Sequence, residues 1–394
     1  MTSRRAFLIV MDSVGIGGAP DADQFFNDDR PDTGANTLAH IARAAPLNMP
    51  HLDALGLGAA LRLASGEDAP GLGRPPQGLW GAATEVSRGK DTPSGHWELA
   101  GVPVPWAWHY FPDTHPAFPP DLSARIAALA GTEGILGDEH ASGTEIIARL
   151  GDRHLQSGWP ICYTSADSVL QIAAHEEAFG LQRLYDLCIE VAKLVHPLRV
   201  GRVIARPFLG QGGSYARTPN RRDFAIAPPS DTLLDVAQAA GAPTHAIGKI
   251  GDIFSHRGID RLHKGASDAD LARHLIRLAD EAEEGSLTFA NFVEFDSLYG
   301  HRRDINGYAR ALEWFDGIAG QFLARLRPGD LAIFTADHGN DPSWSGTDHT
   351  RERVPVLGWG YGAREIGLVG FADVAASVAQ HLGLPAIGPG RVFL

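Results

Sequence analysis

The sequence predicts an α/β protein: a mostly parallel central sheet with helices on both faces, and a separate α+β module inserted into it. Short continuous apolar runs at 5–13, 287–297 and 330–340 each end near an acidic residue, which is typical of strands buried on both faces. Residues 305–326 lie between the last two runs and have helical spacing, so this part of the chain predicts a strand–helix–strand unit. From about 105 to 226 the sequence has its own strand pattern and many turn residues.

Taken in order along the chain, the first expected strand is 5–13, and another expected strand, in THAIGKI, ends at Gly248. The expected helix places Ala309, Leu312, Phe315, Ile318 and Phe322 on one stripe. The inserted module contains a strand within 196–208, and its polar segments 137–145 and 210–223 are expected to be loops. We therefore expect residues 1–104 and 227–394 to form the core and residues 105–226 to form the inserted domain.

Composition excludes several classes of function. The chain has 394 residues and a net charge of −13, from 34 basic and 47 acidic residues, which argues against a nucleic-acid surface. No run approaches the roughly 20 apolar residues of a membrane span, and the apolar run after the first basic residues ends at Asp12, too soon for a signal peptide. The two cysteines, Cys162 and Cys188, are too few to form a disulfide framework in a chain of this length. We expect a cytoplasmic protein.

Acidic residues and histidines gather where the expected strands end. Ligands of open α/β sheets bind beyond the carboxyl ends of the strands, so Asp12, Asp296 and Asp337 are expected at one edge of one sheet. Three histidines follow at short spacing, namely His301, His338 and His349. Mixed carboxylate and imidazole sets suit Mn²⁺ or Zn²⁺. Six ligands are too many for one ion that keeps an open position, and they predict two ions about 4 Å apart that clamp a phosphoryl group.

The segment GKDTPSGHWE (89–98) is expected to be a polar loop that brings a hydroxyl to these ions. A hydroxyl between two cations is activated as a nucleophile. Thr92 is the best candidate and Ser94 the second. Taken singly, each feature has a plainer explanation, since an acid that ends a strand is often a helix cap and Thr-Pro is a turn signal. We interpret His40, His51, His109 and His140 as surface or structural residues.

Seven segments resemble the phosphopentomutase family of the alkaline phosphatase superfamily, along essentially the whole chain. They are MDSVGIGGAPDAD, GKDTPSGHWE, YTSADSVLQIAAHEE, GRVIARPF, RTPNRRD, FDSLYGHRRD and TADHGNDPSWSGTDHTRE. The chain departs from the family at Pro93-Ser94, where a second threonine is expected, and at Glu294, where aspartate is common.

The resemblance implies an alkaline-phosphatase-like core with an inserted cap and two Mn²⁺ ions, for which Mg²⁺, Zn²⁺ or Co²⁺ are possible substitutes. It implies that Asp296, His301 and His349 hold one ion. Asp12, Asp337 and His338 hold the other. Thr92 carries the phosphoryl group as phosphothreonine.

The implied reaction interconverts ribose 1-phosphate and ribose 5-phosphate, and their 2-deoxy forms, through a 1,5-bisphosphate, in nucleoside salvage. A sugar bisphosphate is expected to prime the threonine. Arginine suits bidentate phosphate contact, and the resemblance favours a second phosphate site and a sugar site. Their residues are Arg202, Arg206, Arg217 and Lys249 for the phosphate, and Ser165, Asp167 and Val169 for the sugar.

Three alternatives stay open from the residues. A metal-dependent phosphatase or phosphodiesterase on the same core would pass the phosphoryl group to water. A cofactor-independent phosphoglycerate mutase shares the core and typically has serine where Thr92 stands. A phosphosugar-binding protein without activity would use the metals for structure only.

Overall fold

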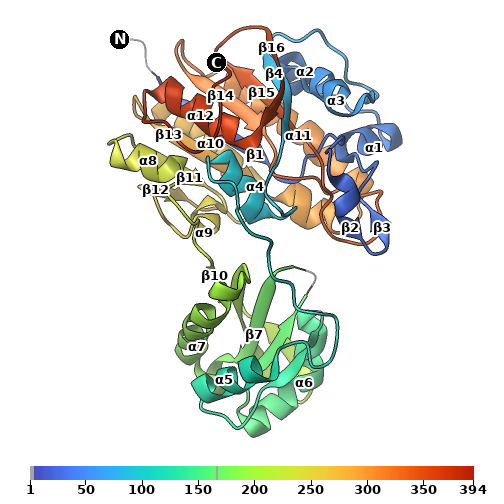
Figure 1. Ribbon diagram of the computed structural model, residues 1–394, viewed down its shortest axis with the longest axis vertical. Helices are drawn as coiled ribbons and strands as arrows, with labels where there is room; N and C mark the ends of the chain where they lie inside the picture. Colours follow the sequence, from blue (N-terminus) through green and yellow to red (C-terminus); the bar gives the residue numbers. More distant parts are fainter. Residues whose placement is uncertain (1–3, 166) are drawn as a thin grey trace. The chain divides into compact units, whose positions relative to one another are not determined.

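The computed structural model describes residues 4–165 and 167–394, and the chain forms two compact units (Figure 1). The first unit joins Met1–Pro105 to Pro228–Leu394, and the second unit is Trp106–Ala227. Both ends of the chain belong to the first unit, so the second unit is an insertion within it.

An eight-stranded sheet forms the centre of the first unit. Across the sheet its strands are β12 (Arg261–His263), β11 (Thr244–Ile247), β13 (Leu287–Phe292), β1 (Ala6–Met11), β14 (Leu331–Thr335), β15 (Val354–Trp359), β4 (Leu79–Thr84) and β16 (Arg364–Gly370). β15 runs antiparallel to β14 and β4, and the other neighbouring pairs are parallel. The predicted mostly parallel α/β fold is confirmed.

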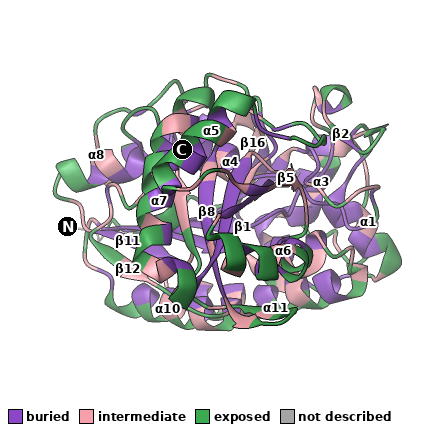
Figure 2. Ribbon diagram, turned by 90° about the horizontal axis from the view of Figure 1, so that it is seen from below, coloured by how far each residue is buried: buried purple, intermediate pink, exposed green. Residues whose placement is uncertain are grey.

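Helices cover both faces of this sheet. On one face, α4 (Thr92–Leu99) and α8 (Leu233–Ala239) contact α12 (Phe371–Leu382), and α9 (Ile250–Ile253) contacts α4. On the other face lie α1 (Thr37–Ala44), α2 (Pro50–Leu55), α3 (Leu57–Ser65), α10 (Asp268–Glu281) and α11 (Ile305–Leu323). Every residue of β1, β13 and β14 is buried, and Figure 2 shows β1 buried while α11 keeps an exposed face. Burial on both faces explains why these strands have continuous apolar runs.

Short elements complete the first unit. They are η1 (Ala22–Gln24), β2 (Phe26–Asn27), β3 (Arg30–Pro31) and the π-helical turn η4 (Phe295–Gly300). None of the described helices is both long enough and apolar enough to cross a membrane.

The second unit is a sheet between two helical layers. Its strand order is β10 (Arg222–Ala225), β8 (Arg202–Gln211), β7 (Val169–His175), β6 (Ile161–Thr164) and β5 (Leu136–His140), with β9 (Ser214–Arg217) also paired to β8. α5 (Pro120–Ala130) and α7 (Leu181–Val195) pack on one apolar cluster, and α6 (Gly143–Ser157) packs on another. The turns η2 (Glu176–Gly180) and η3 (His196–Leu198) flank α7.

Three segments that we expected to be loops are partly regular. Residues 137–145 include most of β5 and the start of α6, and residues 210–223 include β9 and the start of β10. These strands are short and polar because they lie at the margins of the sheet, where one neighbour supplies the hydrogen bonds and water reaches the side chains. Residues 92–98 belong to α4, which begins at Thr92 and ends at Leu99, so the expectation of a loop is wrong there.

Candidate active site

The three predicted acids lie at one edge of the sheet of the first unit. β1 pairs with β13 on one side and with β14 on the other, all parallel, so their carboxyl ends meet. Asp12 follows β1 directly, Asp337 follows β14, and Asp296 lies in η4 after β13. All three are buried, with relative exposures of 0%, 0% and 6%.

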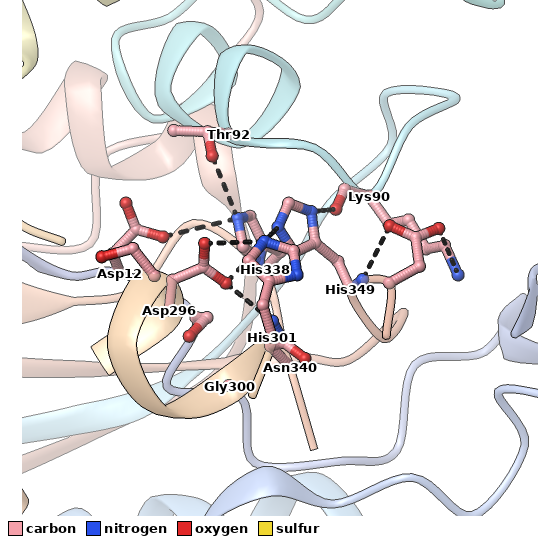
Figure 3. A network of polar contacts seen from close by, with 12 residues as sticks. Asp12, Lys90, Thr92, Asp296, Gly300, His301, His338, Asn340 and His349 are labelled. Atoms are coloured by element: carbon pink, nitrogen blue, oxygen red, sulfur yellow. Dashed lines mark hydrogen bonds and ion pairs between the residues drawn. The ribbon is translucent and has the colours of Figure 1, made fainter. Parts of the chain in front are cut away.

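One group of convergent ligands consists of Asp296, His301 and His349. One ligand atom from each lies within 4.8 Å of the other two. Asp296 Oδ2 is 3.1 Å from His301 Nε2, and Asp296 Oδ1 is 3.4 Å from His349 Nε2. The two imidazoles approach each other with 3.2 Å between their Nε2 atoms (Figure 3).

A second group consists of Asp12, Asp296 and His338, again within 4.8 Å. His338 Nε2 is 3.6 Å from Asp12 Oδ1 and 3.2 Å from Asp337 Oδ2. Asp337 therefore lies next to this group, and Asp296 faces both groups. All six residues that we expected to hold metal gather in this region.

The orientation of the three imidazoles suits metal binding. His301 Nδ1 is 2.6 Å from Thr347 O, His338 Nδ1 is 3.1 Å from Gly339 O, and His349 Nδ1 is 2.8 Å from Lys90 O. A carbonyl only accepts, so each Nδ1 carries the hydrogen and donates it. Nε2 of each ring therefore faces the cluster, and in the neutral imidazole it is the atom that offers a lone pair to a metal.

Two carboxylate oxygens in the same place are unsatisfied. Asp12 Oδ1 and Asp337 Oδ2 are buried and accept no hydrogen bond from any described residue. Buried polar atoms are normally paired, so these two atoms, with the convergent lone pairs, fit divalent cations.

The protonation behaviour of the acids reflects their crowding. Burial, together with the charges of Asp337 and Asp296, raises the pKa of Asp12 well above its ordinary value. Burial alone would also raise the pKa of Asp337, but the imidazoles of His338 and His96 lower it below its ordinary value. Adjacent carboxylates repel one another unless positive charge lies between them, and bound cations would supply that charge.

Thr92 stands beside this cluster as the first residue of α4. Its Oγ1 is 3.4 Å from His338 Nε2 (Figure 3). Asp91 caps the helix by accepting a hydrogen bond from Ser94 N at 3.1 Å, so the Ser94 side chain is turned toward Asp91, where its Oγ donates at 3.0 Å. The structure thus brings Thr92, rather than Ser94, to the candidate metal ligands.

Two asparagines that the sequence reasoning missed hold the carboxylates in place. Asn291 Nδ2 donates to Asp12 Oδ2 at 3.0 Å, and Asn340 Nδ2 donates to Asp296 Oδ1 at 2.8 Å. Asn291 is, with Thr288, one of two polar residues in the fully buried strand β13. A buried polar group needs a partner, so the asparagine in this apolar run was a signal that the sequence offered.

Arg303 connects the loop that carries His301 to the loop that carries His349. It donates to the carbonyls of Gly346 at 2.8 Å, Gly300 at 3.1 Å and Asp348 at 3.0 Å, and also to Asn340 Oδ1. The loop after η4 and the loop before His349 are thereby fixed to each other.

The expected substrate residues are divided between the units. Lys249 is exposed and precedes α9 in the first unit. In the second unit, Arg202 lies 3.2 Å from Asp167 Oδ2, and Arg206 Nε donates to Gln171 Oε1 at 3.0 Å. The remaining expected residues are also in the second unit: Ser165 accepts from Gln171 at 3.4 Å, Arg217 is exposed on β9, and the Val169 side chain is buried in β7.

The fold and the site define a metalloenzyme, and comparison with known proteins agrees. The family model described as Metalloenzyme superfamily matches residues 4–386. The phosphopentomutase of Sinorhizobium medicae (strain WSM419) is 54% identical over 409 residues, covering 99% of this chain and 100% of that protein. The phosphopentomutase of Agrobacterium fabrum (strain C58 / ATCC 33970) is 53% identical over 410 residues, with 99% and 100% coverage. A solved structure of Leishmania mexicana phosphoglycerate mutase is 13% identical, covers 100% of this chain and 97% of that chain, and superposes with a TM-score of 0.49.

The chain therefore belongs to the phosphopentomutase family within this superfamily.

Proposed function

We propose that this protein interconverts ribose 1-phosphate and ribose 5-phosphate, and their 2-deoxy forms, through phospho-Thr92 and a 1,5-bisphosphate intermediate, with two Mn²⁺ ions. The observation that carries the proposal is the position of Thr92 Oγ1, 3.4 Å from His338 Nε2 beside the convergent ligands. Sequence identity of 54% to a phosphopentomutase supports the choice of substrate.

Each ion has a set of three ligands in this proposal. Asp296, His301 and His349 would hold one ion. Asp12, Asp337 and His338 would hold the other. When bound, the cations supply positive charge that favours the alkoxide of Thr92 and neutralises the phosphoryl oxygens.

The transfer is balanced at each step. A pentose monophosphate offers its free hydroxyl to phospho-Thr92; the new sugar O–P bond forms as the Thr92 Oγ1–P bond breaks. The proton lost by the sugar hydroxyl is regained by Thr92 Oγ1 over the step. The bisphosphate then turns over and returns its other phosphoryl group to Thr92 by the reverse exchange, so that the enzyme ends as phospho-Thr92. A sugar bisphosphate primes the first turnover.

A second phosphate site would hold the phosphate that is not being transferred. We assign to it Arg202, Arg206 and Arg217 of the second unit, with Ser165, Asp167 and Val169 toward the sugar; Lys249 of the first unit is a further candidate for phosphate contact. Burial and the guanidinium of Arg221 lower the pKa of Arg206 to about 10. Crowded guanidinium groups of this kind favour an anion between them, which supports a phosphate site on the second unit.

In this proposal the first unit is the catalytic core and the second unit is a cap that carries substrate contacts. The thiols of Cys162 and Cys188 are free, which fits a reducing compartment, and we propose that the protein works in the cytoplasm.

The first prediction concerns Thr92. Thr92→Ala is expected to lower mutase turnover by at least roughly 10³-fold, because the nucleophile is lost, while Mn²⁺ binding and the fold are kept. Thr92→Ser, which retains a hydroxyl, is the matched control and should keep part of the activity. Turnover is measured by ³¹P NMR of ribose 1-phosphate conversion, and phosphorylation of Thr92 by intact peptide mass.

Three outcomes would contradict the proposal in different ways. Full activity of Thr92→Ala would exclude a mechanism through phosphothreonine. Release of free phosphate without ribose 5-phosphate would indicate a phosphatase. Turnover of 3-phosphoglycerate would indicate a phosphoglycerate-type mutase.

A further inference from the structure

His96 lies one helical turn after Thr92, in the position that connects Thr92 to Asp337. Its side chain is fully buried, with 0% exposure. Nδ1 is 3.0 Å from Thr92 O and also 3.0 Å from Asp337 Oδ2. One imidazole nitrogen therefore contacts both the residue proposed as nucleophile and a residue proposed as metal ligand.

The helix approaches the Asp337 turn very closely at this point. A Cβ atom on Gly95 would lie 2.1 Å from Asp337 O, so no larger residue fits there without a shift of backbone. The approach of Gly95 is a second, independent observation that the start of α4 is held against the turn that carries Asp337 and His338.

Packing alone does not account for histidine here. The His96 ring stacks on Phe289, with 6.0 Å between ring centroids, and its Nε2 is buried with no hydrogen-bond partner among the described residues. Burying an unpaired polar atom costs free energy that leucine or phenylalanine would avoid. The contacts of Nδ1 with Thr92 O and Asp337 Oδ2 must therefore offset that cost.

We propose that His96 is a positioning residue that fixes Thr92 relative to Asp337, and thereby places the threonine hydroxyl against the metal ligands. This inference rests on the proposed function, in which Thr92 is the nucleophile. Because a carbonyl only accepts, Nδ1 carries the hydrogen and donates it to Thr92 O. Asp337 Oδ2 accepts no hydrogen bond from the described residues. His96 Nδ1 lies 3.0 Å from it, so the N–H dipole orients this oxygen while its lone pairs stay available to a cation.

The test compares three substitutions of His96. His96→Asn places an amide N–H close to the position of Nδ1, whereas His96→Leu removes the donor at similar volume. His96→Gln moves its N–H one carbon further out, away from the Nδ1 position, and it replaces His96→Leu as the test variant should that variant fail to fold. The probe is Mn²⁺ alone, titrated into chelator-treated protein and followed by the EPR signal of the free ion.

We expect His96→Leu and His96→Gln to bind one of two Mn²⁺ equivalents about 10- to 100-fold more weakly than the wild type. We also expect kcat to fall with little change in KM, because the substrate residues are untouched. His96→Asn should recover most of the Mn²⁺ affinity and of kcat. Unchanged Mn²⁺ affinity in His96→Leu, or equal losses in the asparagine and leucine variants, would overturn the inference and leave His96 a packing residue.

Thr92→Ala separates this inference from the proposed function. If Thr92→Ala loses turnover while His96→Leu binds Mn²⁺ like the wild type, the role of His96 is wrong and the proposed function stands. If Thr92→Ala keeps turnover, the proposed function fails, and the comparison of Mn²⁺ affinities still decides whether His96 orients Asp337.

Discussion

At the scale of single residues, the site is prepared by hydrogen bonds that fix which atoms face inward. Each imidazole Nδ1 donates a hydrogen bond to a backbone carbonyl, that of Thr347, Gly339 or Lys90. The Nε2 atoms of the three rings then face the acidic cluster, where a neutral imidazole can bind a metal. Orientation by such outer partners commonly decides metal affinity as much as the ligands themselves.

Glu352 is a buried carboxyl group that joins the loops behind the site. Its Oε2 accepts from Gly17 N and Thr37 N, both at 2.9 Å, and its Oε1 accepts from the hydroxyls of Thr37 and Thr350. Burial and the charge of Asp341 raise the pKa of Glu352 to about 7, although the hydrogen bonds from Thr350 and Thr37 oppose this.

This pKa predicts a pH dependence of stability. The ordinary glutamate pKa is 4.5 and the folded value is about 7. Between these values the folded protein keeps a proton that the unfolded chain has released. The contribution of Glu352 is therefore fully present below about pH 4.5 and is lost as the pH rises toward 7, by at most about 1.4 kcal/mol per pH unit.

Glu352→Gln lacks this titration and is the control. Its amide oxygen can accept from the two backbone N–H groups and its amide nitrogen can donate to the two hydroxyls. Urea denaturation of chelator-treated protein from pH 4.5 to 7 should show the wild type losing stability relative to the variant as the pH rises. Stability curves that run parallel over this range would contradict the raised pKa.

At the scale of elements, the start of α4 decides where the threonine lies. Asp91 caps the helix and Pro93 occupies its first turn, both favourable at a helix N-terminus. Gly95 then permits the contact with the Asp337 turn. The position of the helix is therefore set by its cap, Asp91, and by the close contact of Gly95 with the Asp337 turn.

The close contact at Gly95 predicts that a glycine-to-alanine substitution there changes stability in the opposite direction to the usual one. Replacing glycine by alanine inside a helix ordinarily stabilises a protein by about 0.5–1 kcal/mol. Gly95→Ala is expected to destabilise instead and to lower activity, since its Cβ would lie 2.1 Å from Asp337 O. Gly317→Ala in α11 is the matched control, because no described atom lies within 4 Å of the position its Cβ would take. Thermal unfolding of both variants checks the opposite signs, and a stabilised, fully active Gly95→Ala would refute the close approach.

Some elements were readable from the sequence and others were not. The apolar runs that become β1, β13 and β14 predicted buried strands, and the spacing of 305–326 predicted α11, which ends at Leu323. α4 gave no such periodic signal, because it buries polar residues such as His96 and Glu98 together with Trp97. Its cap Asp91 and the following Pro93 were the available signals. β9 and β10 were missed because polar marginal strands resemble loops.

At the scale of the whole molecule, parallel topology makes the site. Asp12, Asp296 and Asp337 are far apart in the chain, and they meet because β13, β1 and β14 are parallel neighbours. This convergence could be predicted, since strand ends and acids are both visible in the sequence. The partners Asn291 and Asn340 could not be assigned, because pairing with a particular carboxylate depends on side-chain directions that only the folded structure provides.

The most direct test of the metal site is anomalous diffraction at the manganese edge from crystals of the Mn²⁺-loaded protein. We predict two anomalous peaks in the first unit, one beside Asp296, His301 and His349 and the other beside Asp12, Asp337 and His338. Thr92 Oγ1 should lie next to both. Peaks at other residues, or a single peak remote from Thr92, would contradict the account.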